Sequence, residues 1–175
     1  SDAFTFKTSG GVNLIGNKIT YNRVYGQWQY NTTVTPVAAN TAYVFPLGTA
    51  DTNNIATVGS TSRLIAGAAG TYNLQFSVQA NNDDNGSEHL AYIWLRKNGS
   101  DVTGSMGRVG IAKGTSTAPV IAAWNYIVDS ANTTDYWEIA YAVDDATHVS
   151  FPAYTSTAFG PSTASIITTL TPVGA

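Results

Sequence analysis

Two histidines and two pairs of adjacent carboxylates are the residues of this chain whose types suit chemistry. His89 lies at the expected start of a strand, and His148 follows Asp144 and Asp145 in an expected loop. A Ser–His–Asp triad could draw on either histidine, because its members meet in space rather than in sequence. The segment "TGSMG" misses the Gly-x-Ser-x-Gly pattern of a nucleophile elbow, since Thr103 stands where the first glycine belongs. The sequence therefore predicts no catalytic residues.

The remaining candidates for chemistry are metal ligands. The histidine spacing fails zinc templates, which need paired His or Cys ligands, and the chain has no cysteine. The carboxylates of Asp83–Asp84 and Asp144–Asp145 are adjacent in loops, where they would most simply be solvated. We therefore expect no cofactor and no metal.

One stretch, "NNDDNG", needs closer inspection as a calcium loop. Asn81, Asp83, Asn85 and Gly86 match the opening of an EF-hand loop, but the twelfth position is Tyr92 instead of a bidentate glutamate. A polar turn between two strands is the preferred interpretation. A weak calcium site at Asn81, Asp83 and Asn85 is the alternative.

Composition narrows the class of protein. The chain has 175 residues, which suits one domain, and charged residues make up 11%, against about 25% in an ordinary soluble domain. The net charge is -3 and no run of Lys or Arg occurs, which argues against a nucleic-acid partner. No apolar stretch reaches the roughly 20 residues of a membrane span, so we expect no membrane insertion.

The candidate residues named above must be positioned by β-strands. Segments rich in Val, Ile, Thr, Tyr and Trp are separated by Gly, Asn, Asp and Pro, which is the pattern of an all-β chain. The expected strands are residues 26–35, 41–47, 55–58, 62–65, 71–80, 89–97, 102–111, 118–129, 135–143 and 162–170. About ten strands predict an all-β, two-sheet antiparallel sandwich. The glycine-rich residues 1–25 are expected to be an N-terminal arm or linker, and residues 26–175 the domain itself.

The strand "GTYNLQFSVQA" alternates between apolar and polar residues. Its apolar face comprises Tyr72, Leu74, Phe76 and Val78, and its polar face Asn73, Gln75, Ser77 and Gln79. The polar face carries amides and a hydroxyl but no charge, which is unusual for a surface in open water. The later strand "VIAAWNYIV" is apolar on both faces and needs a cover on both. Because no helix is expected, these two strands predict an oligomer.

Four segments together resemble the jelly roll shared by tumour necrosis factor and the complement globular heads. They are "GTYNLQFSVQ", "YIWLRKNGS", "DYWEIAYAV" and "PSTASIITTL". Gly70 and Tyr72 match the Gly-x-Tyr that opens a central strand of that family. The turn at Thr134 and Asp135 lacks the family's usual glycine, and Ala164 replaces the usual aromatic of the final strand. The similarity covers residues 26–175.

The resemblance implies a trimer-forming jelly roll in which one sheet of each subunit faces a three-fold axis. Carried onto this chain, it gives a candidate interface of Asn73, Gln75, Ser77, Trp124, Tyr126 and Ile167. The cysteine-free, charge-poor style is similar to versions of this domain in bacteriophage virion proteins.

We therefore expect a non-enzymatic bacteriophage structural or attachment protein on the virion surface, as a head or tail fibre, decoration or receptor-binding domain. Its expected partners are its own copies, other virion proteins through the N-terminal arm, and a host-surface glycan or protein. The alternative is a secreted carbohydrate-binding or adhesive module, for which Tyr43, Trp94 and Tyr154 are the candidate ligand-binding residues.

Overall fold

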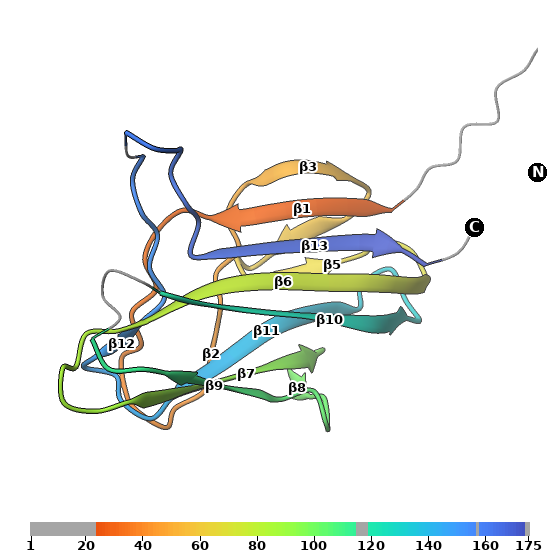
Figure 1. Cartoon of the computed structure of the whole chain (residues 1–175). Helices are drawn as coiled ribbons and strands as arrows, with labels where there is room; N and C mark the ends of the chain where they lie inside the picture. Colours follow the sequence, from red (N-terminus) through yellow and green to blue (C-terminus); the bar gives the residue numbers. More distant parts are fainter. Residues whose placement is uncertain (1–23, 115–118, 157, 174–175) are drawn as a thin grey trace, which may run out of the picture.

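The chain folds into an antiparallel sandwich of two β-sheets (Figure 1). The computed structural model describes residues 24–114, 119–156 and 158–173. Within these ranges there is no helix, and so none that could cross a membrane. The predicted all-β, two-sheet architecture is confirmed. The predicted arm, residues 1–25, lies outside the described residues except for its last two.

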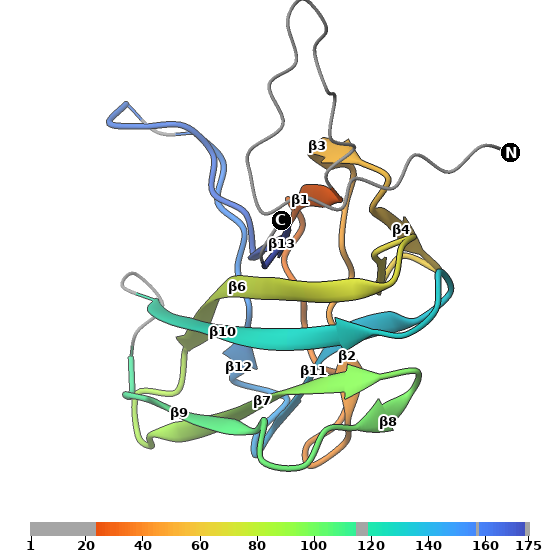
Figure 2. The ribbon, with the colours of Figure 1, turned by 90° about the vertical axis from the view of Figure 1, so that its right-hand side faces the viewer.

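The first sheet has its five main strands in the order β10-β6-β13-β1-β3. They are β10 (Val120–Ser130), β6 (Gly70–Asn82), β13 (Ile166–Pro172), β1 (Tyr25–Tyr30) and β3 (Ala50–Asn54). The short β12 (Val149–Ser150) pairs with the end of β6. In Figure 2, β6 and β10 lie side by side across the middle of the view.

The second sheet has the order β4-β5-β11-β7-β8, with β2 paired to β11 and β9 paired to β7. Its strands are β4 (Thr57–Gly59), β5 (Arg63–Ile65), β11 (Tyr136–Val143), β7 (His89–Lys97), β8 (Ser100–Asp101), β2 (Tyr43–Val44) and β9 (Gly107–Ile111). Along the sequence, the chain crosses between the sheets at eight connections: β1 to β2, β2 to β3, β3 to β4, β5 to β6, β6 to β7, β9 to β10, β10 to β11 and β11 to β12. This two-sheet arrangement is compatible with a jelly roll.

The core lies between the two sheets and is rich in aromatic rings. The predicted apolar face of β6 is confirmed, because Tyr72, Leu74, Phe76 and Val78 are all buried. Phe45 contacts Phe151 edge-on, with ring centroids 4.8 Å apart. Together with the buried aliphatic side chains, these rings exclude water from the space between the sheets.

The predicted strands are largely present, but several boundaries differ, and three short strands, β3, β8 and β12, were not predicted. Residues 102–106 do not extend β9, because Ser105 folds back, donating from its hydroxyl to the Val102 carbonyl (2.7 Å) and accepting from the Leu95 amide (3.0 Å). The sequence "ADTNN" of β3 was not predicted as a strand, since it is polar after Ala50 and lies at a sheet edge, where packing imposes no apolar pattern.

The hairpin between β7 and β8 follows the prediction from "KNGSD". Lys97 and Ser100 are paired, which leaves Asn98 and Gly99 as the two turn residues. Both have positive φ, 51° and 81°, the conformation that a tight two-residue turn needs and that Asn-Gly supplies.

Candidate functional site

The outward side of the first sheet is a broad surface without charge, which we call the uncharged face. It is made of the outward side chains of β10, β6, β13 and β1. Strand register places them in two main rows, Ala123–Ser77–Ile167–Gln29 and Asn125–Gln75–Thr169–Gln27, flanked by Ile121 with Gln79 and by Ile127 with Asn73 and Thr171. These four strands contain a single charged residue, Asp129, near the end of β10.

Three isoleucines project from the uncharged face. Ile121 is 69% exposed, Ile127 62% and Ile167 38%. Between β10 and β13 the smaller side chains leave a shallow groove of about 550 Å³, lined in part by Gln75 and Ser77. The face therefore combines apolar projections with a groove in which amide and hydroxyl groups lie beside apolar side chains.

Charge is confined to the rim of this face. Gln27 and Gln29 donate from Nε2 to the carboxylate of Asp51 on β3, at 3.0 Å and 2.8 Å. At the far end, the Thr71 hydroxyl donates to Asp129 (2.8 Å). A surface whose centre is neutral and whose rim is polar has the anatomy of a protein–protein contact.

Two of the predicted interface residues lie on the other side of the sheet. Trp124 is paired with Phe76 and Tyr126 with Leu74, so their side chains enter the sandwich. The Trp124 ring is 5.5 Å from that of Phe76. The prediction that Trp124 and Tyr126 share a surface with Asn73 and Gln75 is therefore wrong, because alternation puts the intervening residues outward.

Trp124 and Tyr126, the aromatic side chains of β10 that point inward, contact residues of the facing sheet and its loops. The Tyr126 hydroxyl donates to the Ser105 carbonyl (2.7 Å). Trp124 packs on Gly107 so closely that a Cβ there would lie 2.2 Å from its ring. The apolar inner face of β10 is thus covered by the chain itself, and only its outer face is left without a cover among the described residues.

The predicted ligand-binding aromatics do not form one platform. Tyr43 stands beside Tyr141 in the β2–β11 pair, and their rings are 5.7 Å apart on the inner side. Trp94 points outward from β7 and donates from Nε1 to Asp101 (2.7 Å). Tyr154 lies in the segment between β12 and β13, bridged to Thr163.

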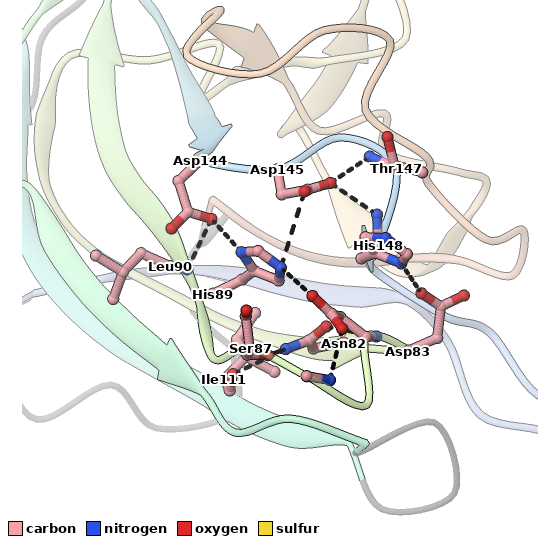
Figure 3. A network of polar contacts seen from close by, with 12 residues as sticks. Asn82, Asp83, Ser87, His89, Leu90, Ile111, Asp144, Asp145, Thr147 and His148 are labelled. Carbon is pink, nitrogen blue, oxygen red and sulfur yellow. Dashed lines mark hydrogen bonds and ion pairs between the residues drawn. The ribbon is translucent and has the colours of Figure 1, made fainter.

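A second polar assembly, the histidine–aspartate cluster, lies where the chain crosses between the sheets (Figure 3). It comprises His89, His148, Asp83, Asp84, Asp144 and Asp145. His89 Nε2 lies 3.3 Å from Asp84 Oδ2, and His89 Nδ1 lies 3.4 Å from Asp144 Oδ1. His148 Nδ1 lies 2.8 Å from Asp83 Oδ1. The carboxylates expected to be merely solvated are thus paired with the two histidines.

Hydrogen bonds shift the pKa values of three residues of this cluster. The Gly86 amide donates to Asp84 (2.6 Å), and this bond lowers the pKa of the Asp84 carboxyl. The amides of Thr147 and His148 donate to Asp145, whose pKa is likewise lowered. The hydrogen bond to Asp83 raises the pKa of His148.

Sequence reasoning missed the cluster because its halves are far apart in the chain. The β6–β7 turn supplies Asp83 and Asp84, and the β11–β12 loop supplies Asp144, Asp145 and His148. Among the described residues, no group of three or more His, Asp and Glu side chains has an arrangement that could hold a metal ion. In the "NNDDNG" stretch, the Asp83 carboxylate faces His148, and the Asp84 carboxylate accepts a hydrogen bond from the Gly86 amide of the same turn.

No protein-family model matches the chain, and no curated protein matches it.

Proposed function

We propose that this protein is a non-enzymatic structural or attachment domain of a bacteriophage virion, which assembles as a homotrimer through the uncharged face. The observation that supports this proposal is the exposed, largely uncharged surface of the edge strand β10. The strand has 11 residues, with no charge before Asp129, and it exposes Ile121 and Ile127. A long, apolar edge strand is a site of association unless it is covered.

A second copy of the chain is the occupant that suits this face best. Its polar side chains are amides and hydroxyls, which can be buried at small cost when each finds a partner. Copies that meet through it bury no like charges, because Asp51 and Asp129 lie at the rim. Candidates Asn73, Gln75, Ser77 and Ile167 all lie on it. The trimeric state and the virion location rest on the jelly-roll resemblance.

The oligomeric state tests the proposal directly. We expect sedimentation to give a trimer, and Ile127→Glu to give a monomer that remains folded. Val37→Glu is the matched control, because Val37 is also an exposed aliphatic side chain (85%) but lies outside the sheets. A monomeric parent, or a trimer that Ile127→Glu leaves intact, would contradict self-association through this face.

A second candidate, a glycan-binding module, has one observation in its favour. The outer side of the second sheet carries Tyr92 with Arg108 against its ring (5.5 Å) and Trp94 with Arg96 against its ring (5.7 Å). Aromatic and guanidinium groups are a common surface for sugars and partner proteins. Glycan binding that the domain retains as a monomer and loses with Trp94→Ala would favour this candidate over a purely structural domain.

A further inference from the structure

The segment between β12 and β13 leaves the sandwich as a hairpin, which we call the projecting hairpin (residues 152–156 and 158–165). Its two limbs are joined by two backbone hydrogen bonds between Tyr154 and Thr163, at 3.1 Å and 2.9 Å. Its sequence contains no charged residue. Figure 1 and Figure 2 both show it extending away from the two sheets. Because a two-stranded hairpin is marginally stable on its own in water, we expect the projecting hairpin to need a further contact.

Phe159 lies in a turn at the far end of the projecting hairpin. Its side chain is 100% exposed, the highest value among the exposed large apolar side chains of the described residues. Phenylalanine is among the residue types most often buried, since its ring gains free energy when it leaves water. The sandwich from which the hairpin projects does not bury this ring. The tip of the hairpin therefore suits a contact with a surface outside its own sandwich.

The base of the projecting hairpin stands at one end of the uncharged face. Gln79 Nε2, on that face, donates to the Ala164 carbonyl of the hairpin (2.8 Å). A pocket of about 300 Å³ lies in the corner between them, lined by Ser162 from the hairpin and by Ile121 and Ile167 from the face. In Figure 2 the hairpin extends to the left, away from β4 of the second sheet at the right. A molecule that docks on this end of the face would therefore also meet the hairpin.

The symmetry of a trimer requires a second surface besides the uncharged face. Two copies that meet through the same surface form a two-fold dimer, which leaves no surface for a third copy. A closed ring of three repeats one contact in which each copy presents two different surfaces. The projecting hairpin suits the second role, because it is uncharged, has an apolar tip and rises beside the face.

We propose that in the trimer each projecting hairpin lies against the neighbouring copy, with the Phe159 ring packed on the exposed isoleucines of that copy's uncharged face. These isoleucines are Ile121, Ile127 and Ile167. The inference rests on the proposed self-association through the uncharged face and deepens it, because it names the segment that reaches the neighbour. The contact buries apolar surface on both copies and buries no charge.

An intermolecular spin-label experiment tests this contact. The chain has no cysteine, so Ala158→Cys introduces a single thiol for the label beside Phe159 and leaves the ring in place. Spin-labelled chains are unfolded and refolded together with isotope-labelled parent chains that carry no spin label. In the parent chains, we expect the methyl signals of the three exposed isoleucines to broaden more strongly than that of Ile93, which is buried on β7.

Val37→Cys provides the matched control for the label. Val37 is 85% exposed and lies in the loop between β1 and β2. That loop is attached to the second sheet, where the Asn40 amide donates to the Val143 carbonyl (2.7 Å). A label at this position should leave the exposed isoleucines of the neighbouring copies unbroadened.

Removal of the ring should weaken the trimer and leave the sandwich intact. Phe159→Ser deletes an apolar side chain that the core of its own chain does not use. We therefore expect the concentration at which half of the trimer dissociates to rise at least about tenfold, with an unchanged spectrum of the folded subunit. Val37→Ser, at another exposed apolar side chain, should change neither quantity.

The outcomes separate the hairpin contact from the self-association on which it rests. A trimer that Ile127→Glu dissociates, but that shows no intermolecular broadening from the label at position 158, would overturn the hairpin contact and leave the uncharged face as the interface. A trimer that is as stable with Phe159→Ser as in the parent would overturn the contact too. A monomeric parent would overturn both proposals.

Discussion

Trp124 of β10 lies directly opposite Phe76 of β6, with ring centroids 5.5 Å apart on the inner side of the first sheet. This pair fixes which residues of β10 enter the core and which leave it. With Trp124 inward, Ala123 and Asn125 must point outward, beside Ser77 and Gln75. The inward position of Trp124 thus accounts for the side chains that β10 contributes to the uncharged face.

Phe76→Ala should lower the free energy of unfolding by about 3–5 kcal/mol, because a ring that is 3% exposed leaves a cavity when it is removed. Urea denaturation at fixed protein concentration measures this loss. Val37→Ala, at a side chain that is 85% exposed, is the control and should change stability by no more than about 0.5 kcal/mol. Equal losses in the two variants would contradict the burial of Phe76.

Gly107→Ala should destabilise the domain by about 1–3 kcal/mol through overpacking. A Cβ at this position would lie 2.2 Å from the Trp124 ring, which would have to move from its contact with Phe76. Gly110→Ala is a matched control on the same strand, since a Cβ there meets no atom within 4 Å. Thermal melting of both variants checks the prediction, and a smaller loss in Gly107→Ala than in Gly110→Ala would contradict it.

Gln75→Glu should weaken the proposed trimer at neutral pH and restore it partly in acid. Gln75 lies in the middle of the uncharged face, where a carboxylate would be poorly solvated and close to the carboxylates of the other copies. Sedimentation of both proteins at about pH 7 and about pH 4.5 measures the effect, since acid protonates a glutamate whose pKa is raised. A variant that stays fully trimeric at neutral pH would exclude Gln75 from the contact.

Asp135→Asn should lower stability at neutral pH and flatten its dependence on pH in acid. Asn98 Nδ2 and the amides of Ala131 and Asn132 donate to Asp135, and these bonds lower its pKa from 3.8 to about 2. A depressed pKa contributes stability that is present above the unfolded value and lost as the pH falls through the folded value. Melting temperatures between about pH 5 and about pH 2 should therefore fall less steeply in the variant. Identical slopes would contradict the role of this carboxylate.

A chelator should leave the melting temperature unchanged. The Asp83 carboxylate is already paired with His148, and Asp84 accepts from the Gly86 amide. A fall of many degrees on adding a calcium chelator, reversed by calcium, would restore the calcium interpretation of Asn81, Asp83 and Asn85.

Most of the fold could be predicted from the alternation of apolar and polar residues and from the residues typical of tight turns. The buried residues of β6 follow from a period of two, and the β7–β8 turn follows from Asn-Gly, because both signals are local. The edge strand β3 could not be predicted in the same way. Its position depends on pairing with β1, and its sequence has no pattern that a buried face would require.

By itself, the sequence determined an all-β sandwich, the apolar face of β6 and the lack of charge on its other face, since each follows from neighbouring residue types. It could not decide the orientation of β10, which is apolar on both faces, so that alternation allows either side to be buried. Contacts with Phe76, Ser105 and Gly107 decide it. Nor could it pair His89 with Asp144 or His148 with Asp83, because only the crossing of the chain between the two sheets brings these distant segments together.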